Sequence, residues 1–86
     1  MPRISVFYGI VIEMYFGDHP PPHFHAHYSG DSAKIEIASG DVIAGSLPPR
    51  ALRLVREWIK EHRDELEANR ERAVSYEKPQ PIEPLR

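Results

Sequence analysis

Apolar and polar residues alternate with the period of a strand along the first half of the chain and then repeat with the period of a helix. The alternation predicts five short strands, because successive side chains of a strand point to opposite faces. Glycine-containing turns separate these segments, and connections this short favour antiparallel neighbours in a meander. The predicted strands cover residues 4–7, 10–16, 23–28, 33–37 and 42–45.

The second half of the chain predicts one long helix. Ser46 is a suitable N-cap residue, because a serine hydroxyl can accept a bond from a backbone N–H of the first turn. Leu47, Pro48 and Pro49 then fill that turn, where the missing N–H groups of proline cost little. The helical pattern continues to about Arg72. The apolar arc that must cover the sheet comprises Ala51, Leu52, Leu54, Val55, Trp58, Ile59 and Leu66.

These elements predict an α+β fold, a small antiparallel meander of about five short strands packed by one long C-terminal helix. A single domain is expected over residues 1–73, followed by a Pro-rich C-terminal tail over residues 74–86. The tail is expected to be extended and partly mobile, with Ile82 and Leu85 as docking points.

The densest chemistry of the chain is a histidine cluster. His19, His23, His25 and His27 lie within nine residues, Asp18 directly precedes them, and prolines 20–22 stiffen the loop before the strand. Histidine titrates near neutrality and is the commonest metal ligand. Within the strand, Phe24, Ala26 and Tyr28 are expected to face the core. His23, His25 and His27 should then face solvent, a groove or another subunit.

A divalent metal site is one interpretation of this cluster. Histidines two apart on a strand can converge on one ion, whereas three in a row cannot easily do so. The predicted ligands are therefore an adjacent pair that includes His25, completed from nearby. Imidazole and carboxylate ligands without thiolate suit zinc, manganese, iron or nickel. The candidate ligands are His19, His23, His25 and Asp18.

Two other interpretations stay open. His19, His23 and His25 are candidate catalytic residues of a small nuclease or hydrolase, in which the RNA 2′-hydroxyl would be the nucleophile and Arg50 or Arg53 would steady the phosphate. Alternatively, the cluster only shapes a rigid strand at a protein interface. The fifth histidine, His62, falls within the apolar arc of the helix. It is expected either to be a core histidine bonded to backbone or to reach the histidine strand.

Composition narrows the class of protein. The 86 residues contain no cysteine, and 11 Lys and Arg against 13 Asp and Glu give a net charge of −2. Proteins that grip phosphate backbones are usually more basic, so nucleic acid is not indicated by charge. No apolar run approaches the roughly 20 residues of a membrane span, and the N-terminus does not resemble a signal peptide. A cytoplasmic location without a membrane partner is therefore expected.

Several motifs resemble a family of small bacterial proteins that is catalogued as a domain of unknown function. They are Ile4-Ser5, Phe7-Tyr8-Gly9-Ile10, Met14-Tyr15-Phe16, Asp18-His19, Pro21-Pro22-His23-Phe24-His25 and Gly45-Ser46-Leu47-Pro48-Pro49-Arg50-Ala51. Family members are often encoded beside another small protein as a toxin–antitoxin-like pair. The resemblance therefore implies a small protein partner, and His27 lies outside it. A homodimer is also compatible with a core this small. The working hypothesis is a partner-binding component of a toxin–antitoxin-like module, with a histidine site for a divalent metal.

Overall fold

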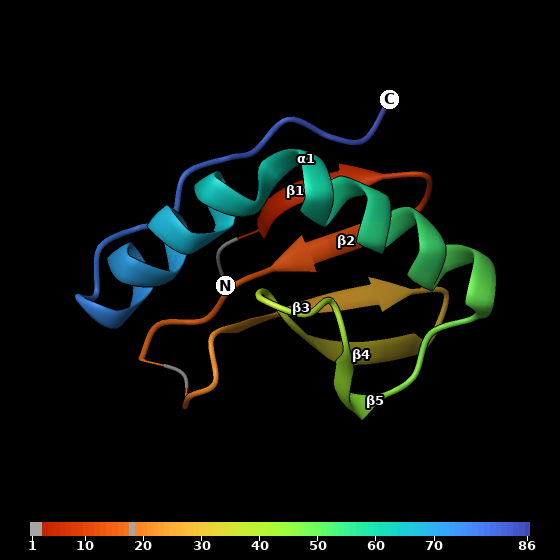
Figure 1. Ribbon diagram of the computed structural model, residues 1–86, viewed down its shortest axis with the longest axis horizontal. Helices are drawn as coiled ribbons and strands as arrows, with labels where there is room; N and C mark the ends of the chain where they lie inside the picture. Colours follow the sequence, from red (N-terminus) through yellow and green to blue (C-terminus); the bar gives the residue numbers. More distant parts are fainter. Residues whose placement is uncertain (1–2, 18) are drawn as a thin grey trace.

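The computed structural model describes residues 3–17 and 19–86, which form one antiparallel sheet and one helix (Figure 1). The strands are paired in chain order, β1-β2-β3-β4-β5, so the sheet is the predicted meander. The α+β fold class is therefore confirmed. The elements are β1 (Arg3–Phe7), β2 (Ile10–Glu13), β3 (His23–Tyr28), β4 (Asp31–Glu36), β5 (Val42–Gly45) and α1 (Pro49–Val74).

The core lies between one face of the sheet and α1. Phe24, Ala26 and Ile35 point from the sheet toward Val55 and Trp58 of the helix, and all five are fully buried. Trp58 is the centre of this layer, because its ring lies 5.2 Å from the ring of Phe7 and 5.8 Å from that of Phe24, centroid to centroid. The alternation of the sequence thus identified the inward row of each central strand.

Strand β2 ends three residues earlier than the sequence predicted. Pairing with β3 stops at Glu13, opposite His25, and Met14 is still buried while Phe16 is 43% exposed. The reason is Gly17, whose φ of +60° turns the chain and whose N–H donates to the carbonyl of Ala73 near the end of α1. The alternation of apolar and polar residues alone does not reveal that β2 ends at Glu13.

The predicted N-cap of the helix is wrong. Helix α1 begins at Pro49, and the N-cap position is Pro48, which offers no side-chain hydrogen bond. The N–H of Ser46 instead donates to the carbonyl of Ser32, so Ser46 continues the pairing of β5 with β4. Pro48 is held extended at φ −57° and ψ 149°, as expected of a residue that precedes proline.

Helix α1 buries five residues of the predicted arc and two further positions, while Leu52 and Leu54 of the arc are only partly buried. Ala51, Val55, Trp58, Ile59 and Leu66 are buried as expected, and the stripe continues to Asn69 and Ala73. The backbone leaves helical geometry at His62, where φ is −128° and ψ is 22°. No helix in the described part of the chain is long and apolar enough to cross a membrane.

The C-terminal segment returns along α1 and crosses toward β1 (Figure 1). Ile82 and Leu85, the predicted docking points, are buried against the core. The N–H of Ile82 donates to the carbonyl of Ile4 at 2.8 Å, and the indole N–H of Trp58 donates to the carbonyl of Glu83 at 2.8 Å. The segment therefore extends both the sheet edge and the core.

Candidate functional site

The histidine row lies on the face of the sheet opposite α1, which we call the outer face. Pairing of β3 with β2 and β4 places Glu13 and Lys34 beside His25, and Val11 and Ser32 beside His27. Among residues 3–17 and 19–86, no helix or second sheet covers this face. The predicted orientation of the row, away from Phe24 and Ala26, is therefore correct. The outer face comprises Val6, Val11, Glu13, His23, His25, His27, Ser32, Lys34, Glu36 and Ala44.

His23 is less accessible than the sequence suggested. Its side chain is only 4% exposed, so it faces neither solvent nor an open groove. Its ring atom Nδ1 lies 2.7 Å from the carbonyl oxygen of Pro21. Since a carbonyl only accepts hydrogen bonds, Nδ1 is the protonated nitrogen in this contact. The loop between β2 and β3 therefore fixes both the ring and its tautomer.

His25 occupies the middle of the row and is half-buried. Its ring packs edge-on against Tyr15, with centroids 4.1 Å apart, and against His23, with centroids 5.3 Å apart. A shallow hollow beside it is lined by Ser32, Lys34 and Gly45. His25 is thus held by aromatic contacts on one side and accessible on the other.

His27 contacts Glu13 across the strands. Its Nε2 lies 2.9 Å from Oε1 of Glu13, although the two atoms are not aligned for a hydrogen bond. The same Oε1 accepts a hydrogen bond from the hydroxyl of Tyr15 at 3.1 Å. Tyr15, Glu13 and His27 therefore form a continuous polar chain that ends beside His25.

Sequence reasoning missed Glu13 and Tyr15 as site residues, although a signal was present. The alternation of residues 10–16 places Val11, Glu13 and Tyr15 on one face, opposite the core-facing Ile12 and Met14. An antiparallel neighbour puts that face beside the histidine row. Combining the two patterns would have found both residues.

The predicted metal ligands are only partly gathered. The rings of His23 and His25 are neighbours, whereas His19 is exposed in the loop between β2 and β3. The metal candidate Asp18 lies outside the described residues. Within residues 3–17 and 19–86, no group of three histidine, aspartate or glutamate side chains is arranged to hold a metal ion.

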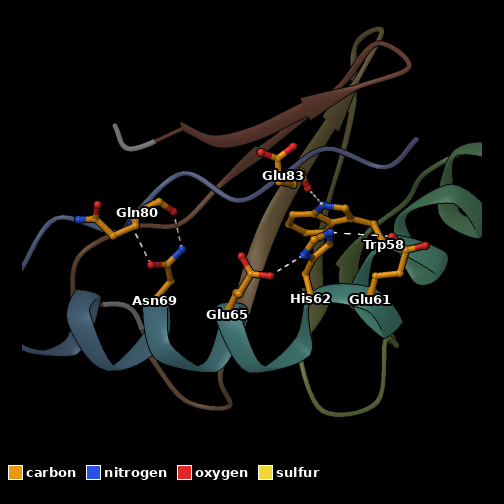
Figure 2. Close-up of polar contacts among 7 residues, drawn as sticks. All are labelled: Trp58, Glu61, His62, Glu65, Asn69, Gln80 and Glu83. Carbon is orange, nitrogen blue, oxygen red and sulfur yellow. Dashed lines mark hydrogen bonds and ion pairs between the residues drawn. The ribbon is translucent and has the colours of Figure 1, made fainter.

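His62 belongs to α1 and therefore lies on the other side of the sheet from the histidine row. Its Nδ1 is 2.6 Å from Oε1 of Glu65, and its ring centroid is 5.9 Å from that of Trp58 (Figure 2). It therefore bonds a carboxylate, not the backbone as the core interpretation predicted. His62 also does not reach the histidine row, because the row points away from α1 on the outer face of the sheet.

The fold and the site define a class, a single-sheet α+β domain with a histidine row on its outer face. The chain belongs to the family described as a domain of unknown function, DUF4160, whose model matches residues 9–70. The matched part runs from the turn before β2 through most of α1 and includes the whole histidine cluster. No curated protein and no solved structure matches the chain.

Proposed function

We propose that this chain is the partner-binding component of a toxin–antitoxin-like module and that it binds its protein partner through the outer face of the sheet. The observation that carries the proposal is the asymmetry of the sheet. One face is buried under α1, while the other holds an organised row of side chains without a covering layer in residues 3–17 and 19–86.

The outer face is rigid in a way that favours binding. His25 is wedged between Tyr15 and His23, and His27 is held by Glu13. Side chains that are already ordered lose little conformational entropy when a partner covers them. An antiparallel sheet can leave one face in water. A solvated face needs no ordered contacts between its side chains, so the contacts of His25 and His27 favour a binding role for this face.

The chemistry of the face suits a protein more than a polyanion. Glu13 and His27 already neutralise each other when the imidazole is protonated, and Lys34 lies on the same face as Glu36. Val6, at 45% exposure, adds an apolar position next to Val11. Mixed surfaces with aromatic and apolar anchors are typical of protein interfaces. The resemblance to a family encoded in pairs supports a small protein partner.

Val6→Glu is expected to weaken binding of the proposed small protein partner by at least about tenfold, because it buries an unpaired carboxylate in the interface. Val74→Glu is the matched control, since Val74 is equally apolar and 50% exposed but lies at the end of α1. Calorimetry on the co-expressed, separated proteins measures both. Equal affinity of the two variants, or a loss only with Val74→Glu, would contradict the proposal.

Divalent metal binding at the histidine cluster is a second proposal, favoured by the orientation of His23. A histidine that ligates metal usually donates its other ring N–H to a carbonyl or carboxylate, as Nδ1 of His23 does to Pro21. His25 would be the second ligand, and Asp18 or His19 would complete the site. Zinc, manganese, iron and nickel all suit these ligands.

The metal proposal predicts that tag-free protein binds zinc with a dissociation constant below about 1 µM. His25→Ala should weaken binding at least about a hundredfold, because it removes one of two central ligands. His62→Ala is the control, since His62 lies on the other side of the sheet. Titration with equal affinity for the wild type and His25→Ala would refute the site.

A histidine nuclease is supported less by the geometry. With His23 only 4% exposed, an RNA phosphate reaches His25 and His19 but not His23 unless the loop moves. General acid–base catalysis needs the histidine within hydrogen-bond reach of the reacting proton. We therefore place partner binding ahead of catalysis.

A further inference from the structure

The C-terminal segment 79–85 lies between α1 and β1, where it bonds to Asn69 and Trp58 of the helix and to Ile4 of the strand (Figures 1 and 2). We call the surface that this segment covers the groove. Pro79, Ile82 and Leu85 are buried, while Gln80, Pro81, Glu83 and Pro84 are exposed. A buried side chain at every third position is the period of a polyproline II helix, which has three residues per turn. The buried positions of the segment therefore follow the spacing of a polyproline II peptide that docks on a groove.

The groove recognises the backbone of this segment. Asn69, itself 1% exposed, accepts a hydrogen bond from the N–H of Gln80 at 2.8 Å and donates to its carbonyl at 2.7 Å. Three residues on, the indole of Trp58 donates to the carbonyl of Glu83. Grooves that bind polyproline II peptides use aromatic walls and side-chain donors to peptide carbonyls in this way.

The connection between α1 and the segment is strained. Tyr76 has a φ of +59°, a left-handed conformation that suits glycine and is unfavourable for a tyrosine. The turn is closed by the N–H of Glu77, which donates to the carbonyl of Arg72 at 2.7 Å. The Tyr76 side chain is 74% exposed, and its ring stacks on that of Phe16 with centroids 6.4 Å apart, so this contact offsets only part of the backbone strain. An open turn would relieve it.

We propose that the groove between α1 and β1 accepts the C-terminal segment of a second copy of this chain, so that two copies exchange segments and form a dimer. Every contact of the segment is the same whichever copy supplies it; only the turn at Tyr76 differs. Strained, short connections favour such exchange. In the closed monomer the tethered segment competes at an effective concentration of about 1 mM, so the wild-type chain exchanges only at high concentration.

The test compares three variants of the full chain by sedimentation equilibrium, with far-UV circular dichroism to verify folding. Tyr76→Pro cannot adopt a positive φ and opens the turn, whereas Tyr76→Gly relieves the strain and keeps the turn closed. We expect Tyr76→Pro to dimerise with a dissociation constant at least about tenfold below that of Tyr76→Gly. Adding Ile82→Glu to Tyr76→Pro should restore the monomer, because Ile82 is buried in the groove.

A folded, monomeric Tyr76→Pro chain would overturn the proposal, and so would a dimer that persists in the Tyr76→Pro, Ile82→Glu double variant.

If Tyr76→Pro does not fold, a peptide-binding experiment tests the same proposal. The full chain carrying Ile82→Glu has a weakened tail of its own. It should bind a labelled peptide of residues 77–86 saturably, and the same peptide with Ile82→Glu at least about tenfold more weakly. No binding up to about 1 mM would refute the exchange.

The proposal is independent of partner binding at the outer face. The groove and the histidine row lie on different parts of the domain, and the variants at Tyr76 and Ile82 leave Val6 and His25 in place. Loss of one activity therefore does not imply loss of the other.

Discussion

Trp58→Ala is expected to lower the free energy of unfolding by about 3–5 kcal/mol, the usual loss for a fully buried tryptophan. Trp58 is 0% exposed and lies at the meeting point of Phe7, Phe24 and the tail. Small domains have on the order of 5–10 kcal/mol of stability, so this single change leaves little. Urea denaturation measures this loss. It is followed by far-UV circular dichroism and not by tryptophan fluorescence, because Trp58 is the one tryptophan of the sequence.

Trp58→Phe separates the two roles of this side chain. It keeps an aromatic ring near Phe7 and Phe24 but loses the hydrogen bond to the carbonyl of Glu83. The expected loss is about 1–2 kcal/mol, from one hydrogen bond and a small cavity. Equal destabilisation by Trp58→Ala and Trp58→Phe would mean that the indole N–H, and not the ring packing, dominates.

Asn69→Ala is expected to release the C-terminal segment and to cost about 1–3 kcal/mol. The variant leaves both the N–H and the carbonyl of Gln80 without the partners that Asn69 provides. The segment can detach and bond to water, so the loss cannot exceed the free energy with which the segment docks. Hydrogen exchange should show faster exchange of the Ile82 amide, which otherwise donates to Ile4.

Gln80→Ala is the control for Asn69→Ala. The contacts between these two residues use only the backbone of Gln80, and its side-chain amide donates to Lys78 on the surface. The expected change is therefore below about 0.5 kcal/mol, as for most surface substitutions. A larger loss with Gln80→Ala than with Asn69→Ala would contradict the role assigned to Asn69.

The sheet was predictable from the sequence because burial on one face imposes a period of two. The inward rows of β3 and β4 and the outward histidine row all follow from it. What alternation cannot supply is the point at which a strand stops. That point depended on Gly17 bonding to Ala73, two residues that are far apart in the sequence.

The helix was predictable in its apolar stripe but not in its start. Ser46 is a favourable N-cap residue by type. Its backbone N–H, however, donates to the carbonyl of Ser32 in β4, and this bond keeps Ser46 in the sheet and away from the start of the helix. A tertiary contact thus outweighed a local preference. Asn69 was missed for a related reason, because a polar residue on the buried stripe gains its partner only when the tail returns to it.

The sequence predicted where the histidine site lies but not how its side chains are arranged. The sequence placed His23, His25 and His27 on one face, but the accessibility of each depends on neighbours from other segments. Pro21 fixes His23, Tyr15 packs on His25, and Glu13 binds His27. These contacts come from the loop and from β2, whose register is set by the whole sheet.

The central claim, that the partner binds the outer face of the sheet, is tested most directly by the nitrogen NMR signals of the histidine rings. The chain provides its own control, because His25 and His27 lie on the outer face and His62 lies beside Trp58 on the other side. Adding the proposed protein partner should shift the ring signals of His25 and His27 and leave that of His62 unchanged. A shift of His62 with no change at His25 and His27 would contradict the account.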